Sequence, residues 1–260
     1  MEPISLAVSI AGLAGLFNNA LDWFEYVQLS KAFGTDFRTS LLRLDNARLR
    51  LSRWGEAMGL SGGIDNTKAL DMVKTDRERK IAEDSLGQIL NLFEQALKVS
   101  KGYQSNSLLT HRRQDLFNQD NLCSEKNLDG TIALLHERTR TIIQRRQNKL
   151  PLSKKIRFAL HDRAQLDELV NKITSLTNDL LNNFPAARAV QDQLCAAEVS
   201  VFNEHLRILS STVAGMDRTL ADALSKVLDT TAQNNYQNSD SVIMNQGHTH
   251  GGTFTQTITK

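Results

Sequence analysis

The chain has 260 residues, 40% of them hydrophobic, with 31 Lys and Arg against 29 Asp and Glu. This size suits one large domain or two small ones, and the net charge of +2 gives no overall basis for binding nucleic acid. Two cysteines, Cys123 and Cys195, are too few for a disulfide framework and have no metal-binding spacing. A reducing cytosol is the expected compartment, and the small number of prolines, three, favours long helices.

The first predicted element is an apolar helix from Ile4 to about Leu29. No charged side chain occurs between Pro3 and Leu21, and large apolar residues recur there every three or four positions. A secretory signal peptide would have a basic start, but residue 2 is Glu and the first basic side chain is Lys31. We therefore expect this helix to remain in the mature protein.

The same segment has the length of a membrane span but a borderline composition. Ser5, Ser9, Asn18 and Asn19 dilute its apolar character. Small residues recur at four-residue spacing, which permits close helix contact in lipid but also suits ordinary packing in a bundle. Both interpretations stay open from the residues alone. The candidate membrane-insertion residues are Leu6, Ala7, Ile10, Ala11, Leu13, Gly15 and Phe17.

A break is expected at Gly34, and a second helix is predicted from about Asp36 to Met58. Its apolar residues should form one buried stripe, and its arginines should lie on the opposite, solvated side. The stripe comprises Phe37, Leu41, Leu44, Ala47, Leu51, Trp54 and Met58, and the arginines are Arg38, Arg43, Arg48, Arg50 and Arg53. A glycine-rich turn over residues 59–63 separates it from a third helix, expected from about Asn66 to Lys101.

Beyond a long polar loop, which has room for a short hairpin, three further helical tracts are expected. One begins near Leu128 and is broken near Pro151. The next contains the stripe from Leu166 to Leu180 and ends at Phe184-Pro185. The last runs from about Ala187 to Leu228 as one helix or as two, with Gly215 as the natural interruption. These elements predict an all-α helical bundle over residues 1–227.

Residues 228–260 have a different composition, rich in Asn, Gln, Thr and Gly and almost without charge. Such a segment cannot bury enough apolar surface to fold alone. Its two short pieces of high β propensity favour a cross-β amyloid made of stacked identical chains, although a plain disordered tail is the simpler alternative. The candidate amyloid-core residues are Val242, Ile243, Gln246, Gly247, Gly251, Phe254, Gln256 and Ile258.

No motif for an active site, a cofactor or a metal is present, so the chain is not expected to be an enzyme. His248 and His250 alone are incomplete ligation for a metal ion. One stretch is strongly basic and interleaved with apolar residues, which suits either an anionic membrane leaflet or an ordinary solvated face. Its candidate lipid-facing residues are Arg138, Arg140, Arg145, Arg146, Lys149, Lys154, Lys155 and Arg157.

Three blocks of sequence closely resemble the fungal HeLo domain of heterokaryon-incompatibility proteins of the HET-S/HET-s type. They are AGLFNNALDWFEYVQL, FGTDF followed by LRLDNARLRLSRWGEAMGL, and LSKKIRFALHDRAQLDELV. The resemblance implies a helical bundle with a short β hairpin, acting as a cytosolic cell-death effector. It also implies that amyloid conversion of a carboxy-terminal region disturbs the bundle, drives oligomerisation and moves the amino-terminal helix into the plasma membrane as a pore.

The tail departs from that pattern, because it lacks the two charged pseudo-repeats that build a β-solenoid in such proteins. The segment NQGHTHGGTFTQ instead resembles shorter fungal amyloid signalling motifs, which pair with a matching motif on a nucleotide-binding receptor. The expected partners are therefore the chain itself, such a receptor and, after activation, membrane lipids, with no nucleic acid. The alternative function is a non-toxic prion reservoir or an inhibitor of a toxic relative.

Overall fold

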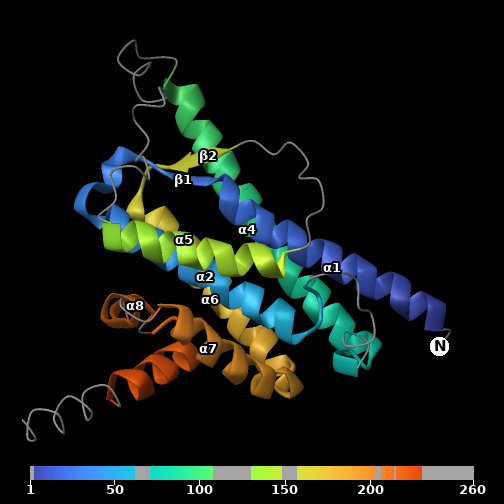
Figure 1. Cartoon of the computed structure of the whole chain (residues 1–260). Helices are drawn as coiled ribbons and strands as arrows, with labels where there is room; N and C mark the ends of the chain where they lie inside the picture. Colours follow the sequence, from blue (N-terminus) through green and yellow to red (C-terminus); the bar gives the residue numbers. More distant parts are fainter. Residues whose placement is uncertain are drawn as a thin grey trace, which may run out of the picture.

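The computed structural model describes residues 3–61, 69, 71–107, 130–147, 157–202, 206–213 and 215–229. It gives no side-chain description for residues 3–9, 31, 32, 35, 103–107, 207 and 211 within these ranges. The predicted amyloid core and the long loop after residue 107 lie outside the described residues. The described part is a helical bundle, as the sequence predicts (Figure 1).

The helix α2 (Phe37–Ala57) runs through the middle of the bundle. Around it lie α1 (Pro3–Tyr26), α5 (Gly130–Arg146), α6 (Arg163–Asn183), α7 (Arg188–Phe202) and α8 (Leu206–Val213), all of which contact it. The helix α4 (Asp76–Ser107) packs against α1 and α6. A final helical segment covers residues 218–229 and leads to the tail. Every neighbour of α2 therefore buries a different part of its circumference.

Local signals in the sequence set several helix boundaries. The third predicted helix is interrupted: residues 69, 71 and 72 are helical, and α4 begins at Asp76, where Thr75 and Glu78 form a reciprocal capping box. The backbone N–H of Glu78 donates to the Thr75 hydroxyl at 3.1 Å, and the Thr75 N–H donates to the Glu78 carboxylate at 3.0 Å. At the break after α8, Gly215 has a φ of 80°, which a residue with a side chain rarely adopts. The expected interruption at Gly215 is thus confirmed.

The small sheet pairs β1 (Val27–Leu29) with β2 (Phe158–Leu160) in parallel, with Val27 opposite Phe158. It is not the hairpin that the resemblance implies, because parallel strands cannot be joined by a tight turn. The first helix consequently ends at Tyr26, before the predicted end at Leu29. A 3-10 segment, η1 (Lys31–Asp36), then carries the chain through Gly34, at a φ of 50°, into α2.

Aromatic side chains join α1, α4 and β2 in one part of the core. The Trp23 ring stacks on Phe93 with centroids 5.9 Å apart, and Phe24 meets the same ring edge-on at 4.9 Å. Phe158 approaches Trp23 at 6.2 Å. Among the described residues, no helix combines the length and hydropathy needed to cross a bilayer.

Candidate functional site

The helix α1 buries one face and exposes another. Ile10, Leu13 and Phe17 are completely or almost completely buried, which is the stripe that the apolar spacing predicts. Ala11 and Gly15 are exposed, so these small residues make no close helix contact in this fold. The other two candidates, Leu6 and Ala7, have no described side chain. The buried face is held against α2 and α4.

One contact between α1 and α2 depends on a missing side chain. The Phe17 ring lies directly over Gly55, where an added Cβ atom would come within 2.1 Å of a ring carbon. Trp54, the next residue of α2 toward the amino terminus, meets the same ring edge-on with centroids 6.4 Å apart. Because both Phe17 and Trp54 are fully buried, the ring has little room to move. Gly55 therefore lets the two helices approach closely.

The carboxy-terminal end of α1 is held by charge. The buried guanidinium of Arg48 on α2 donates to the Glu25 carboxylate of α1 at 2.8 Å. The same nitrogen lies 3.2 Å from the side-chain oxygen of Gln147, just after α5. The helix α1 is thus attached to α2 by apolar contacts along its length and by an ion pair near its last turn.

Three arginines on α2, Arg48, Arg50 and Arg53, are buried, which corrects the prediction that they lie on a solvated side. The other two, Arg38 and Arg43, are exposed and partly exposed respectively. The prediction was wrong for the buried ones because α2 has neighbours all round, so no side of its central turns faces water. Burial of a guanidinium requires paired anions, and the fold supplies them.

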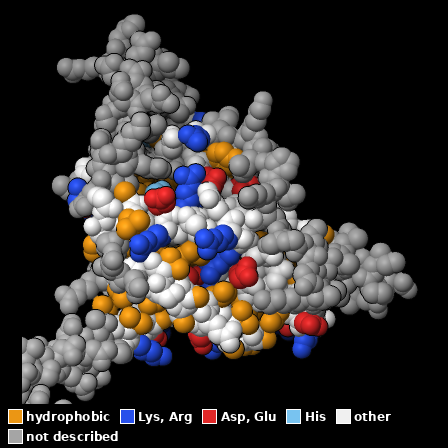
Figure 2. Space-filling model, in the orientation of Figure 1, with side chains coloured by type: hydrophobic (Ala, Val, Ile, Leu, Met, Phe, Trp, Pro, Cys, Tyr) orange, Lys and Arg blue, Asp and Glu red, His pale blue; other side chains and the backbone are white. Residues whose placement is uncertain are grey.

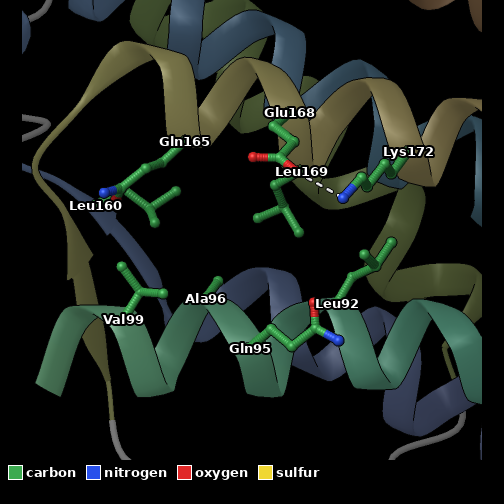
Figure 3. A pocket seen from close by; sticks show the side chains of 9 residues that line it. All are labelled: Leu92, Gln95, Ala96, Val99, Leu160, Gln165, Glu168, Leu169 and Lys172. Atoms are coloured by element: carbon green, nitrogen blue, oxygen red, sulfur yellow. Dashed lines mark hydrogen bonds and ion pairs between the residues drawn. The ribbon is translucent and has the colours of Figure 1, made fainter. Parts of the chain in front are cut away.

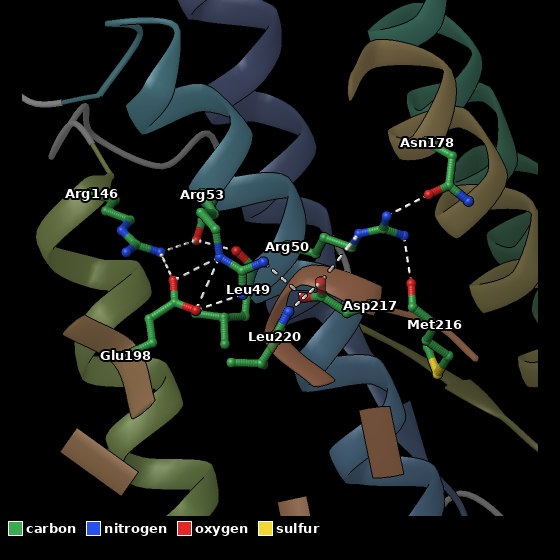
Figure 4. A network of polar contacts seen from close by, with 10 residues as sticks. Leu49, Arg50, Arg53, Arg146, Asn178, Glu198, Met216, Asp217 and Leu220 are labelled. Carbon is green, nitrogen blue, oxygen red and sulfur yellow. Dashed lines mark hydrogen bonds and ion pairs between the residues drawn. The ribbon is translucent and has the colours of Figure 1, made fainter. Parts of the chain in front are cut away.

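The most buried arginine, Arg53, is 1% exposed and pairs with two carboxylates from distant parts of the chain (Figure 4). Its Nε atom donates to Glu198 of α7 at 3.0 Å, and one terminal nitrogen donates to Asp217 at 2.8 Å. Arg146 of α5 donates to the other side of Glu198 at 2.6 Å and to the Ser52 hydroxyl at 3.3 Å. This group, Arg50, Arg53, Arg146, Glu198 and Asp217, is called the ionic cluster below.

Burial and ion pairing have opposite effects on the pKa values of the arginines in the cluster. Burial alone would lower the pKa of Arg53, but Asp217 and Glu198 reverse that effect and hold it well above its ordinary value. For Arg50, burial outweighs the attraction of Asp217, so its pKa is lowered. Nearby, burial raises the pKa of the Cys195 thiol to about 12, so this side chain is a neutral, unreactive thiol in the folded state.

Asp217 connects the cluster to the segment that precedes the tail. It is 0% exposed, and its second carboxylate oxygen accepts the backbone N–H of Leu220 at 3.2 Å, capping the final helical segment. Arg50 reinforces this position by donating to the Met216 carbonyl and to the side chain of Asn178 on α6. The start of residues 218–229 is therefore fixed to α2 through one carboxylate.

The described residues of the predicted basic stretch lie in different surroundings. Arg146 points into the ionic cluster, and Arg138 donates to the Val201 carbonyl at 2.9 Å. Arg140, Arg145 and Arg157 are exposed, while Lys149, Lys154 and Lys155 lie outside the described residues. Basic side chains on the face that α5 forms are interspersed with acidic and apolar ones (Figure 2).

The groove between α4 and α6 offers little for chemistry. It has a volume of about 220 Å³ and is lined mainly by aliphatic side chains, with the Glu168–Lys172 ion pair at its rim (Figure 3). His136 lies 2.7 Å from the Asp45 carboxylate. Within the described ranges, no three His, Cys, Asp or Glu side chains are grouped as metal ligands.

Sequence periodicity missed the ionic cluster because it treats every charged residue as solvated. One signal could have revealed it: Leu42, Leu44, Leu49 and Leu51 surround the arginines on several sides of α2. A helix that is apolar all round is a buried helix. The charges on such a helix then need partners.

Comparison with known proteins supports this picture. A family described as prion inhibition and propagation, the HeLo family, matches residues 5–211. Heterokaryon incompatibility proteins s and S of Podospora anserina are each 34% identical over 230 residues, which cover 88% of this chain and 75% of theirs.

Solved structures agree with these matches. The HET-S N-terminal domain superposes with a TM-score of 0.73 at 33% identity, covering 89% of this chain and all of that one. A mutant HET-s N-terminal domain gives 0.71 at 33% identity, covering 84% and 98%. The chain therefore belongs to the HeLo family of fungal heterokaryon-incompatibility domains, which are not enzymes.

Proposed function

We propose that this protein is an amyloid-triggered, membrane-permeabilising executioner of cell death. In the resting state α1 is stored in the bundle. Templated folding of residues 228–260, by a matching motif on a nucleotide-binding receptor or by other copies of this chain, then releases α1 to insert and oligomerise in the plasma membrane. One observation carries the proposal: a continuous series of contacts links the start of the tail to α1.

The first part of that series runs from the tail to α2. The tail follows directly on the helical segment over residues 218–229, whose first turn is capped by the buried Asp217 carboxylate. A new β structure that draws in these residues would withdraw Asp217 from Arg53 and Arg50. Removing one partner from a buried ion pair costs about 3–5 kcal/mol, because it leaves a buried charge uncompensated. That is a large part of the stability of a typical domain.

The second part runs from α2 to α1. Arg53 and Gly55 are two residues apart on α2, on either side of Trp54, and Gly55 lies against the Phe17 ring of α1. A shift of α2 after loss of Asp217 would therefore disturb the close contact that holds α1. Once released, α1 would expose Ile10, Leu13 and Phe17, each contributing about 1.5–3 kcal/mol on transfer from water. The exposed Ala11 and Gly15 provide the small residues that allow helices to associate in lipid.

The test is dye release from anionic liposomes by the purified full chain, with and without preformed fibrils of residues 230–260. We expect release to require both fibrils and α1. In addition, Asp217→Asn should lower the amount of fibril needed, since the buried anion that fixes residues 218–229 is weakened. Release that persists after deletion of residues 3–21 would contradict the proposal.

A second function is a non-toxic prion reservoir or inhibitor of a toxic relative. It draws support from the equal 34% identity to proteins s and S, which does not distinguish between them. In this case fibrils of residues 230–260 recruit the chain, but no dye escapes. Either function places the resting protein in the cytoplasm, and only the first places it later at the plasma membrane.

A further inference from the structure

A polar cavity lies where α6, α7 and the turn before the final helical segment meet. Its volume is about 560 Å³, within the range of small-molecule sites. The walls come from the end of α6, the start of α7 and residues 215–219. The side chains that matter for binding are Arg50, Arg188, Arg218, Asn178, Asn182 and Gln191.

Positive charge dominates this cavity. Arg50, Arg188 and Arg218 contribute cations, and Asp192 is the opposing carboxylate in the lining. Arg218 is exposed and has no ion pair with any described residue, and the contact of Arg188 is a long one, 3.4 Å, to the Asn182 side chain. The two exposed arginines are at the start of α7 and at the start of the final helical segment, so they approach the cavity from different walls.

Two buried donors in the same lining lack acceptors. Gln191 is 3% exposed, and its side-chain Nε2 has no hydrogen-bond partner. The Nε atom of Arg50 is also without a hydrogen bond, although it lies 3.8 Å from Asp217. The other guanidinium nitrogens of Arg50 reach Asn178 and the Met216 carbonyl at the inner side of the cavity (Figure 4). A buried donor of this kind can be satisfied by water or by an acceptor on a ligand that enters the cavity.

We propose that this cavity binds a compact polyanion carrying at least two phosphate groups. Guanidinium groups match phosphate oxygens in a two-pronged geometry, and arginines on separate walls need anionic groups that are separated as well. The Gln191 amide supplies a neutral donor in the same lining. A single phosphate would engage one wall, whereas a diphosphate group can engage both.

The location gives such a ligand a regulatory effect, and this consequence rests on the proposed function. A polyanion that contacts α6, α7 and residues 215–219 would hold the residues on both sides of Asp217 in their resting positions. Because it binds the folded state, it stabilises that state in proportion to its concentration. The ligand would therefore raise the amount of fibril required to release α1.

Binding itself is tested on the full chain with inorganic pyrophosphate, by calorimetry and by thermal unfolding. We expect saturable binding that raises the unfolding temperature, with inorganic phosphate at least tenfold weaker. Arg188→Gln and Arg218→Gln should each lower the affinity for pyrophosphate about three- to tenfold. Gln191→Leu should also lower this affinity, without lowering the unfolding temperature of the free protein. Arg77→Gln, an exposed arginine on α4 with no described partner, is the matched control and should change nothing.

Equal pyrophosphate affinity in the Arg188, Arg218 and Arg77 variants would overturn the site, and so would a parent protein that binds neither millimolar pyrophosphate nor the vesicles described next. A second arm uses vesicles that contain phosphatidylinositol bisphosphate, to distinguish a lipid headgroup with two phosphates from a soluble ligand. If the parent protein binds vesicles but no pyrophosphate, and the Arg218→Gln variant loses vesicle binding, the ligand is a lipid headgroup. That result would overturn the proposal of a soluble ligand. Pyrophosphate binding in a protein that never releases dye would leave this site intact and refute the proposed function alone.

Discussion

The two helices α1 and α2 have similar lengths, 24 and 21 residues, and opposite compositions. The apolar α1 lies at the side of the bundle and leaves Ala11, Gly12 and Gly15 exposed. The charged α2 lies at the centre and buries Arg48, Arg50 and Arg53. Position in this fold therefore does not follow hydropathy.

This difference explains how the bundle can hold a helix whose hydrophobicity is almost sufficient for insertion into a membrane. The contacts of α1 are mostly apolar and one-sided, so most of them can be exchanged for lipid; the exception is the ion pair between Glu25 and the buried Arg48 near its last turn. Those of α2 are ionic and enclosed, so they hold only while every partner is present. The helix α1 is therefore suited to leave the bundle, and the ionic contacts of α2 control whether it leaves.

The largest expected effect comes from disrupting the ionic cluster around α2. Arg53→Met removes the guanidinium that Glu198 and Asp217 share, which leaves Arg146 and Arg50 as their remaining cations. It should lower the free energy of unfolding by about 3–5 kcal/mol, measured by urea denaturation. The control is Arg163→Gln, which removes an exposed pair with Asp36 at 2.6 Å and should cost less than about 1 kcal/mol. Equal losses in the two variants would mean that the ionic cluster does not hold the bundle together.

The next effect concerns the contact between the two helices. Gly55→Ala forces a methyl group into the Phe17 ring and should destabilise the protein by about 1–3 kcal/mol. It should also permit dye release without fibrils, because α1 is displaced. Gly87→Ala on α4 is the control, since nothing lies within 4 Å of its added Cβ atom, and it should stabilise by up to about 1 kcal/mol. If the Gly55→Ala variant is as stable as the parent, the contact between Gly55 and Phe17 does not hold α1 in place.

A pH-dependent effect tests the surroundings of Cys195, which lies near the ionic cluster. The pKa of Cys195 is raised to about 12 in the folded state, so above pH 9 the unfolded thiol loses its proton while the folded one keeps it. Stability should therefore fall with rising pH, by about 1 kcal/mol between pH 8 and pH 10. Urea midpoints of the parent and of Cys195→Ala measure it. Parallel pH profiles for the two proteins would contradict the buried, neutral thiol.

The smallest effect on stability tests the other region. Leu13 is 0% exposed, so a lysine there would unfold the resting protein and reveal nothing about insertion. Ala11→Lys is placed on the exposed face and should change stability by about 0.5 kcal/mol or less. A lysine near the middle of a spanning helix costs about 2.5–3.5 kcal/mol in the bilayer, so fibril-dependent dye release should be lost.

Ala189→Lys, an exposed alanine on α7, is the matched control for Ala11→Lys and should release dye normally. If Ala11→Lys folds and still releases dye as the parent does, α1 is not the inserted helix. If both lysine variants lose release, the added charge acts at the liposome surface and not through insertion of α1.

Local patterns predicted most of the helices but not their ionic contacts. The stripe from Leu166 to Leu180 and the Phe184-Pro185 stop place α6 within a few residues of its observed bounds. Arg53, in contrast, pairs with Glu198 and Asp217, which are 145 and 164 residues away. Strand β1 was missed for the same reason, since its partner β2 follows α5 and only that pairing ends the helical pattern at Tyr26.

Hydrogen exchange on the full chain, seeded with fibrils of residues 230–260 in the absence of lipid, tests the central claim most directly. The account predicts that seeding increases the exchange of amides in residues 218–229 and in residues 10–26 of α1, while those of α6 remain protected. If the fibrils recruit the chain and residues 218–229 exchange faster while α1 stays fully protected, the ionic cluster does not control the release of α1, and the account is contradicted.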